Sequence, residues 1–251
     1  MKRRHSIDIS ERNGVRTLHF GSRWVQGAMR IKRPFDLELA YARDMLFPLF
    51  LNSEEGWPRR ILQIGLGAGS LAKWCYRYLP AAEITVLEID ARVYAAARQF
   101  FELPANDARL NVLVEDGVAW LMASDASWDL ILLDGYDADG KSGGLSSLEF
   151  YQRCRELLSP RGVLSVNTLG LPNKNASGMD EGEGALHKAF EGDDGAVIRL
   201  PACESGNRIF LAGSNSLKQD LGKREAISER LEFLRSLFGL DFGRLALCFF
   251  S

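Results

Sequence analysis

The chain has 251 residues, of which 46% are hydrophobic and 25% are charged, and its formal net charge is −2. This balance is typical of one sizeable folded α/β domain with a small appendage, and it excludes the strongly basic proteins that bind nucleic acid nonspecifically. No apolar run approaches the roughly 20 residues of a membrane-spanning helix, so no membrane partner is expected. The N-terminus lacks an apolar signal core, which predicts a cytoplasmic protein.

The N-terminal residues 1–35 contain three short alternating runs, with Asn13-Gly14 between the first two. Asn-Gly between alternating runs is a strong hairpin signal. We therefore expect residues 1–35 to form a short N-terminal antiparallel β segment, and residues 36–251 to form the main domain. Within that domain, the apolar spacing of residues 36–52 predicts a helix that Pro48 kinks or ends.

From residue 60 onward, near-continuous apolar strands alternate with helices, a pattern that indicates a parallel sheet covered on both faces. The pattern predicts a doubly wound, mostly parallel seven-stranded sheet, closed by an antiparallel pair, with a loop at 171–186 and a final helix at 217–237. The expected strands are 60–67, 82–90, 110–117, 128–135, 162–169, 195–201 and 207–213. The expected helices between them are 68–79, 91–101, 118–124 and 147–158, the last stopped by Ser159-Pro160.

A glycine-rich turn follows the first of these strands, with Gly65, Gly67 and Gly69 in a G-x-G-x-G pattern. Glycine there permits close backbone approach to a ligand and dihedral angles that a side chain would forbid. Glu88 ends the next strand, at about the distance expected of an acceptor for ribose hydroxyls. Because Ser70 stands where a dinucleotide motif carries its third glycine, the spacing favours a nucleoside sulfonium over a dinucleotide.

Two further acids end the next two strands. Asp116 is suited to accept a hydrogen bond from an adenine amino group, and Asp134 ends the fourth strand. In an open parallel sheet, ligands bind outside the carboxyl ends of the strands, so Glu88, Asp116 and Asp134 are expected to converge on one pocket. Asp134 begins an acidic loop with Asp137 and Asp139, which predicts a positively charged substrate; Asp139 beside Gly140 is interpreted as a turn residue.

The chain resembles the spermidine synthase (polyamine aminopropyltransferase) family and, more broadly, the class I methyltransferase fold. The similarity runs from about residue 20 to 170 and is most specific in "LLDGYDADG" with the following "LSSLEFYQRCRELLSPRGVLSVN". "VLEID" resembles the ribose-binding motif, and "EDG", with Asp116 and Gly117, resembles the adenine-contacting motif. Gln26 resembles a nucleoside-holding Gln, and Tyr41 resembles a Tyr of the polyamine pocket.

The resemblance implies a transferase of polyamine biosynthesis. It would move an aminopropyl group from decarboxylated S-adenosylmethionine to an amine such as putrescine, without a metal. Asp134 matches the catalytic Asp, which positions the amine and accepts its proton. Asp137 matches a second substrate-binding acid. Residues 36–251 would be a methyltransferase-like nucleoside-binding domain, and since homodimers are common in the family, a homodimer is one expected assembly.

The sequence departs from the family where the donor's aminopropyl ammonium would be held. The family usually carries an Asp in its glycine turn, and Ala68 stands there instead. Ala138 replaces a Pro, and residues 167–169 replace a Gln-Gly-Glu run. Two alternatives therefore stay open: a methyltransferase that uses intact S-adenosylmethionine, and a non-catalytic nucleoside-binding relative.

Metal binding is not expected. His5, His19 and His187 show no mutual spacing of metal ligands. The cysteines also lie far apart in the sequence and are interpreted as packing residues.

Overall fold

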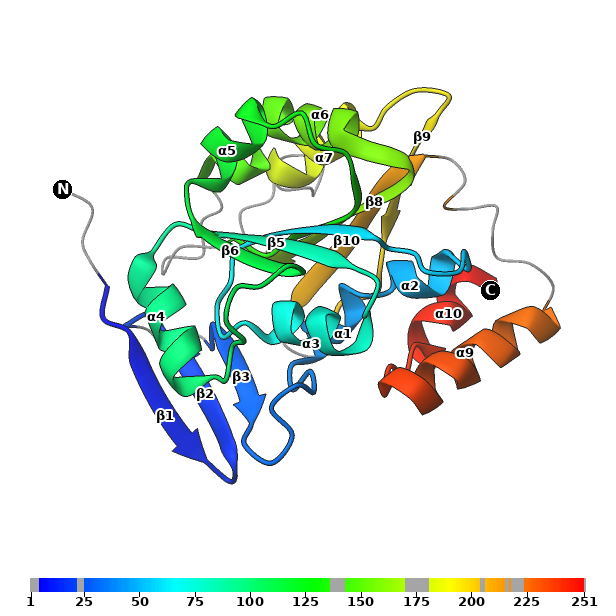
Figure 1. The fold of residues 1–251 in the computed structure, drawn as a ribbon. Coiled ribbons are helices and arrows are strands. Elements are labelled where there is room, and N and C mark those ends of the chain that lie inside the picture. The colour runs from blue at the N-terminus through cyan, green and yellow to red at the C-terminus, as the bar shows by residue number, and fades with distance from the viewer. Residues whose placement is uncertain are drawn as a thin grey trace.

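The computed structural model describes residues 5–21, 25–135, 143–169, 181–203, 206–214, 217 and 224–250. A seven-stranded sheet forms its centre, in the order β6-β5-β4-β7-β8-β10-β9 (Figure 1). The strands are β4 (Arg60–Ile64), β5 (Glu83–Glu88), β6 (Leu110–Val114), β7 (Trp128–Leu133), β8 (Leu158–Leu169), β9 (Gly195–Arg199) and β10 (Asn207–Ser214). Only β10 runs antiparallel to its neighbours among these pairs. The predicted doubly wound, mostly parallel sheet is confirmed.

A separate three-stranded antiparallel sheet precedes the main one. It consists of β1 (Asp8–Arg12), β2 (Val15–His19) and β3 (Gly27–Arg30). The turn between β1 and β2 is Asn13-Gly14, with φ of 53° and 75°, the left-handed conformation that this dipeptide favours in tight hairpins. The short N-terminal antiparallel segment expected from the sequence is therefore present.

Helices cover both faces of the large sheet (Figure 1). One face is covered by α5 (Gly117–Ala123), α6 (Leu148–Leu157) and α7 (Glu181–Ala189), with the short 3-10 helix η1 (Gly143–Ser146) before α6. The other face is covered by α1 (Ala40–Asp44), α2 (Pro48–Leu51), α3 (Ser70–Tyr78), α4 (Ala91–Phe100), α9 (Arg224–Phe238) and α10 (Gly243–Phe250).

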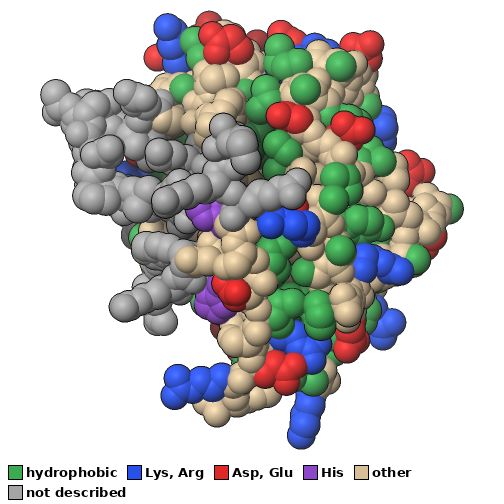
Figure 2. Space-filling view, turned by 90° about the vertical axis from the view of Figure 1, so that its left-hand side faces the viewer, with side chains coloured by type: hydrophobic (Ala, Val, Ile, Leu, Met, Phe, Trp, Pro, Cys, Tyr) green, Lys and Arg blue, Asp and Glu red, His purple; other side chains and the backbone are tan. Residues whose placement is uncertain are grey.

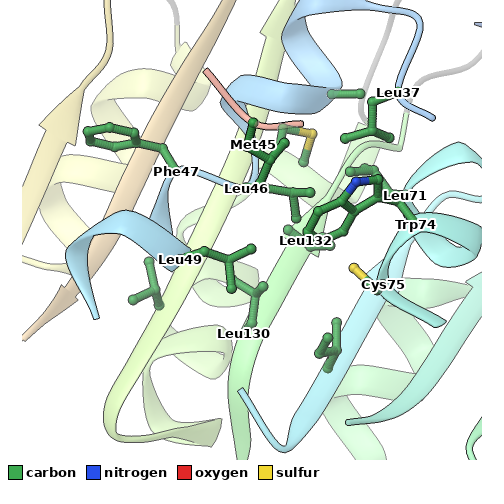
Figure 3. Packing of buried hydrophobic residues seen from close by; sticks show 14 of the residues in the cluster. Leu37, Met45, Leu46, Phe47, Leu49, Leu71, Trp74, Cys75, Leu130 and Leu132 are labelled. Atoms are coloured by element: carbon green, nitrogen blue, oxygen red, sulfur yellow. The ribbon is translucent and has the colours of Figure 1, made fainter. Parts of the chain in front are cut away.

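The core has two main layers because successive strand residues point to opposite faces of the sheet. Leu130 and Leu132 of β7 belong to the cluster beneath α1, α2 and α3, whereas Ile131 and Leu133 belong to the cluster beneath α5 and α6. Figure 3 shows the first layer, where Trp74 of α3 and Leu46 approach the β7 leucines. Strands that are apolar on both faces are what a parallel sheet between helices requires.

Four boundaries differ from those expected. The helix predicted over 36–52 is two short helices, because Leu46 and Phe47 donate to carbonyls three residues back and Pro48 then opens α2. The helix predicted over 147–158 is α6, which ends at Leu157, just before the Ser159-Pro160 pair expected to stop it; the strand after it, β8, begins at Leu158 and not at 162, so the pair lies inside β8. The predicted loop 171–186 ends in α7, although its residues 171–180 lie outside the described ranges. The helix expected over 217–237 as the last one corresponds to α9, but a further helix, α10, follows it.

Two arginines connect the C-terminal helices to α1 and α2 through hydrogen bonds and an ion pair. The Arg230 guanidinium donates to the backbone carbonyls of Leu49, Phe50 and Asn52 at the end of α2. Arg244 of α10 pairs with Asp44 of α1, with 2.7 Å between Nη2 and Oδ2. Figure 1 shows α9 and α10 packed beside α2. The two C-terminal helices are thus attached to the helices that precede β4.

Within the described ranges, no helix is long and apolar enough to cross a membrane. Figure 2 shows the side of the molecule that carries the N-terminal sheet and α4. Acidic and basic side chains are interspersed there with hydrophobic ones, in keeping with the net charge of −2.

Candidate active site

The glycine-rich turn lies tightly between two other segments of the chain. Gly65 has φ of 92°, and a Cβ on it would lie 2.2 Å from the backbone oxygen of Asp134. A Cβ on Gly67 would lie 2.8 Å from the backbone oxygen of Gln26. The glycines predicted to admit a ligand therefore also allow this turn to contact the end of β7 and the segment before β3. This packing brings Gln26 and Asp134 to the same place.

The turn continues into α3, with Gly69 as the N-cap residue in the left-handed conformation. Ser70 Oγ donates to the backbone oxygen of Ala28 at 3.0 Å, which ties the start of α3 to β3. Gly27 packs directly against Ala68, since a Cβ on Gly27 would lie 2.5 Å from Ala68 Cβ and 2.7 Å from its backbone nitrogen. The N-terminal sheet thus forms one wall of the site.

Asp134 is held by side chains from two distant elements. Asn167 Nδ2 of β8 donates to its Oδ1 at 2.8 Å, and Tyr41 OH of α1 donates to its Oδ2 at 3.1 Å. Asn167 Oδ1 in turn accepts from Asn207 Nδ2 of β10 at 3.0 Å. Burial raises the pKa of the Asp134 carboxyl group above its usual value, while the bonds from Asn167 and Tyr41 oppose that rise. The result is a fixed carboxyl group with an increased affinity for a proton.

Glu88, at the end of β5, braces the glycine-rich turn. Its Oε2 accepts from the backbone nitrogen of Leu66 at 3.0 Å, and its Oε1 accepts from that of Asp90 at 2.9 Å. Burial raises the pKa of Glu88, and the bonds from Asp90 and Leu66 oppose the rise. Each carboxylate oxygen has two lone pairs, so these bonds leave acceptor capacity for a ligand.

Asp116, at the end of β6, is the N-cap of α5. Its Oδ1 accepts from the backbone nitrogens of Val118 at 2.8 Å and Ala119 at 3.2 Å. Its Oδ2 makes no hydrogen bond to the described part of the chain. The next residue, Gly117, lies so close to Ile64 of β4 that a Cβ on it would be 2.7 Å from Ile64 Cγ2. Asp116 is thus a helix cap with one oxygen left over.

A small pocket opens beside Asp134. Its wall includes three of the residues expected in the site, Gln26, Tyr41 and Asp134, together with Ala68 and Gln63. Glu88, Asp116 and Gly117 do not line it; they follow along the same edge of the sheet, at the ends of β5 and β6. Asp137 lies outside the described residues, and so does Asp139.

Three polar residues of the site were not expected from the sequence: Gln63, Asn167 and Asn207. Asn167 lies near the end of β8, two residues before Leu169, and the rule of strand ends could have indicated it. Asn207 begins an antiparallel strand, so placing it requires the order of the strands as well. Gln63 is one polar residue within a buried strand and gives little signal in sequence. The described residues contain no group of three or more His, Cys, Asp or Glu side chains arranged to hold a metal ion.

Comparisons with solved structures agree with the fold. A probable spermidine synthase from Corynebacterium glutamicum superposes with a TM-score of 0.68 and 20% identity, covering 94% of this chain and 91% of that one. Human methyltransferase-like protein 13, in complex with SAH, gives 0.65 and 22% identity, covering 79% and 92%. The sheet is therefore that of the class I methyltransferase fold.

Sequence comparison is more specific. The spermine/spermidine synthase domain model matches residues 39–221. The polyamine aminopropyltransferase of Chromobacterium violaceum is 36% identical over 237 residues, covering 94% of this chain and 86% of that protein. The corresponding protein of Neisseria meningitidis serogroup A is 32% identical over 239 residues, covering 95% and 87%. The range matched by the family model spans Tyr41, the glycine-rich turn and Asp134. The chain belongs to the spermine/spermidine synthase family.

Proposed function

We propose that the chain transfers an aminopropyl group from decarboxylated S-adenosylmethionine to an amine such as putrescine, in polyamine biosynthesis. Membership of the family supports this, as do relatives named polyamine aminopropyltransferase over most of the chain. The observation that carries the proposal is the carboxyl group of Asp134, enclosed beside a pocket and held by Tyr41 and Asn167.

The chemistry needs a base beside the attacking amine. A diamine is an ammonium ion at neutral pH, so one nitrogen must first lose a proton. Asp134 accepts that proton, and the freed lone pair attacks the aminopropyl carbon bonded to the sulfonium sulfur. The new C–N bond forms as the C–S bond breaks. The electron pair of the C–S bond goes to sulfur, so the nucleoside product is neutral methylthioadenosine. A raised pKa makes Asp134 a better proton acceptor than an exposed carboxylate.

The nucleoside would lie along the ends of β4, β5 and β6. Glu88 would accept from the ribose hydroxyls, and Asp116 Oδ2, with Gly117 beside it, would face the adenine. Gln26 would close the nucleoside from the N-terminal side, over Gly65, Gly67 and Gly69. Tyr41 and Asp137 would contact the amine substrate. In this arrangement residues 1–35 supply Gln26 to a nucleoside-binding domain formed by 36–251; cytoplasmic location and a homodimer stay predictions.

A methyltransferase is the second candidate, and Ala68 favours it. An acid at position 68 would oppose the carboxylate of intact S-adenosylmethionine, and Ala68 removes that opposition. Under this reading the transferred group is the methyl carbon and the second product is S-adenosylhomocysteine.

Turnover with the two donors separates the candidates. The purified chain is incubated with putrescine and either donor, and the nucleoside product is identified by chromatography. We expect methylthioadenosine from the decarboxylated donor, with kcat falling roughly 10²–10⁴-fold in Asp134→Asn, the usual range for a lost general base. Asp129→Asn is the matched control, because Asp129 lies at the other end of β7 and accepts from Arg59, Arg60 and Ser159.

Release of S-adenosylhomocysteine alone would overturn the proposal in favour of the methyltransferase. Absence of either product across a panel of amines would favour the non-catalytic relative.

A further inference from the structure

Gln63 lies in β4, one residue before Ile64 and the glycine-rich turn. Its side chain is buried, with 2% of the residue exposed, yet it lines the same pocket as Tyr41 and Asp134. Its neighbours in the strand, Leu62 and Ile64, are apolar core residues on the opposite face. A lone amide among apolar strand residues therefore borders the place where the substrates would meet.

The orientation of this amide is set by one hydrogen bond. Gln63 Nε2 donates to the backbone oxygen of Gly65 at 2.7 Å, so the other end of the amide must be the oxygen. That oxygen, Oε1, is buried and has no hydrogen-bond partner in the described structure. Buried acceptors are nearly always paired, because leaving one unpaired is costly. The oxygen is thus available to a donor group that a ligand brings.

Position 68 of the glycine-rich turn offers no such acceptor. Ala68 lines the pocket with a methyl group, and Gly27 of β3 packs against it so closely that Gly27 could not carry a Cβ without a shift. The position at which the family resemblance places an acid for the donor's ammonium is therefore apolar here and closed from outside by the N-terminal sheet.

We propose that Gln63 Oε1 accepts a hydrogen bond from the aminopropyl ammonium of the donor, doing from β4 what an acid at position 68 would do from the turn. This inference rests on the proposed function and deepens it. A carbonyl oxygen attracts an ammonium and repels a carboxylate. Gln63 and Asp134 would together favour the decarboxylated donor over S-adenosylmethionine, whose extra carboxylate would enter the same pocket.

The test compares two ligands that differ in the aminopropyl group. Methylthioadenosine has the nucleoside and sulfur but lacks that group, whereas the decarboxylated donor carries it. Calorimetry on Gln63→Leu should show the affinity for the decarboxylated donor falling between roughly 10- and 100-fold, the loss expected for one hydrogen bond to a charged group. The affinity for methylthioadenosine should stay unchanged.

This pair of ligands distinguishes recognition from a structural effect. If Gln63 only braced the turn through Gly65, the variant would lose affinity for both ligands equally, and the inference would be wrong. Gln63→Glu supplies a second variant: its protonated carboxyl group can donate to Gly65 and still present an acceptor, so it should recover most of the preference for the decarboxylated donor below neutral pH. Failure of that recovery, with both variants folded, also counts against the inference.

The outcomes separate the inference from the function on which it rests. Wild-type protein that binds methylthioadenosine but not the decarboxylated donor contradicts both. Wild-type protein that releases methylthioadenosine, paired with a Gln63→Leu variant of unchanged donor KM, contradicts only the role of Gln63. A rise in KM for putrescine without one for the donor would assign Gln63 to the other substrate and overturn the inference.

Discussion

Asp134 is subject to two opposing influences. Enclosure by protein favours the neutral acid, while the amide of Asn167 and the hydroxyl of Tyr41 favour the carboxylate. Enclosure is the larger influence, so the pKa of the folded state lies above that of the unfolded chain. A group of this kind stabilises the fold at low pH and loses that contribution as pH rises through the folded-state pKa.

The first prediction concerns this linkage. Asp134→Asn keeps an acceptor for Asn167 but removes the titration. Relative to wild type, the variant should therefore gain stability as pH rises from about 4, near the unfolded pKa of Asp, toward neutrality. Urea unfolding of both proteins across that range measures the difference in the free energy of unfolding. Parallel stability curves would mean that the Asp134 carboxyl group is not held at a raised pKa.

The second prediction ranks the two side chains that donate hydrogen bonds to Asp134. Removing either side chain should raise the pKa of Asp134 further and move the acidic limb of the pH profile of kcat/KM to higher pH. Asn167→Ala should move it more than Tyr41→Phe, because the Asn167 bond is 2.8 Å against 3.1 Å and opposes the burial effect more strongly. Hydrogen bonds to charged groups are worth about 1.5–3 kcal/mol, which corresponds to a shift of about one to two pH units.

Thr168→Val is the control for that series. Thr168 neighbours Asn167 on β8 but donates to the backbone oxygen of Arg208 and not to Asp134. The pH profile of kcat/KM of Thr168→Val should coincide with that of wild type. A larger shift in Tyr41→Phe than in Asn167→Ala would reverse the assigned order.

Residues at strand ends were the predictable part of the site. Asp134 and Glu88 each follow an apolar strand, and parallel strands bring their carboxyl ends to one edge. Asp116 was predicted by the same rule, and in the structure one of its oxygens caps α5. Gln63 was missed because a polar residue inside a strand is recognised only when its unpaired oxygen and its neighbours across the pocket are known.

At the level of elements, the glycine-rich turn is decisive because it packs against Asp134, the residue that follows β7. Gly65 is required there for two reasons. Its φ is 92°, and a Cβ on it would lie only 2.2 Å from the backbone oxygen of Asp134, too close for any side chain. Backbone atoms cannot move aside as the end of a flexible side chain can. The position of Asp134 therefore depends on this glycine as well as on its own hydrogen bonds.

The third prediction separates these two requirements. Gly65→Ala and Gly206→Ala both place alanine at positive φ, but a Cβ on Gly206, at 83°, meets nothing within 4 Å. The shared backbone strain should cost about 1 kcal/mol in each variant. Gly65→Ala should cost a further 1–3 kcal/mol or so through overpacking, and should reduce activity as well. Equal unfolding midpoints in urea would show that the contact with Asp134 is relieved without cost.

Sequence patterns located the strands of the large sheet better than the helices at either end of the main domain. The strands are long apolar runs, and their number follows from counting them. The helix expected over 36–52 is divided because its apolar spacing continues through a turn at Leu46 and Phe47, which local pattern does not distinguish from helix. The helix α10 was missed since "GRLALCFF" is only eight residues long and has one charged residue, Arg244, to mark a polar face.

At the scale of the whole molecule, the site is assembled from segments that meet only through tertiary contacts. Gln26 is the residue before β3, Tyr41 lies in α1, and Asp134 is the residue after β7. The helix α1 has only five residues, too short to be stable alone, so its position depends on what it packs against. Asp44, three residues after Tyr41, joins α1 to α10 through Arg244. The C-terminal helix therefore supports the helix that carries Tyr41, a residue proposed to contact the substrate.

The last prediction tests that support. The Asp44 side chain is 10% exposed and that of Arg244 is 50% exposed. Arg244→Met therefore leaves the more buried member of the pair, the Asp44 carboxyl group, without its ion-pair partner. Burial already raises the pKa of Asp44 against the opposing charge of Arg244, and without Arg244 the pKa should rise further. We expect a loss of about 1–3 kcal/mol in Arg244→Met, the cost of leaving a buried polar group unpaired, and recovery of most of it in Asp44→Asn/Arg244→Met. Urea unfolding gives the three free energies, and the KM for putrescine should rise in the single variant and return in the double one as α1 regains its place. A double variant no more stable than Arg244→Met would show that the ion pair acts through more than the charge of Asp44.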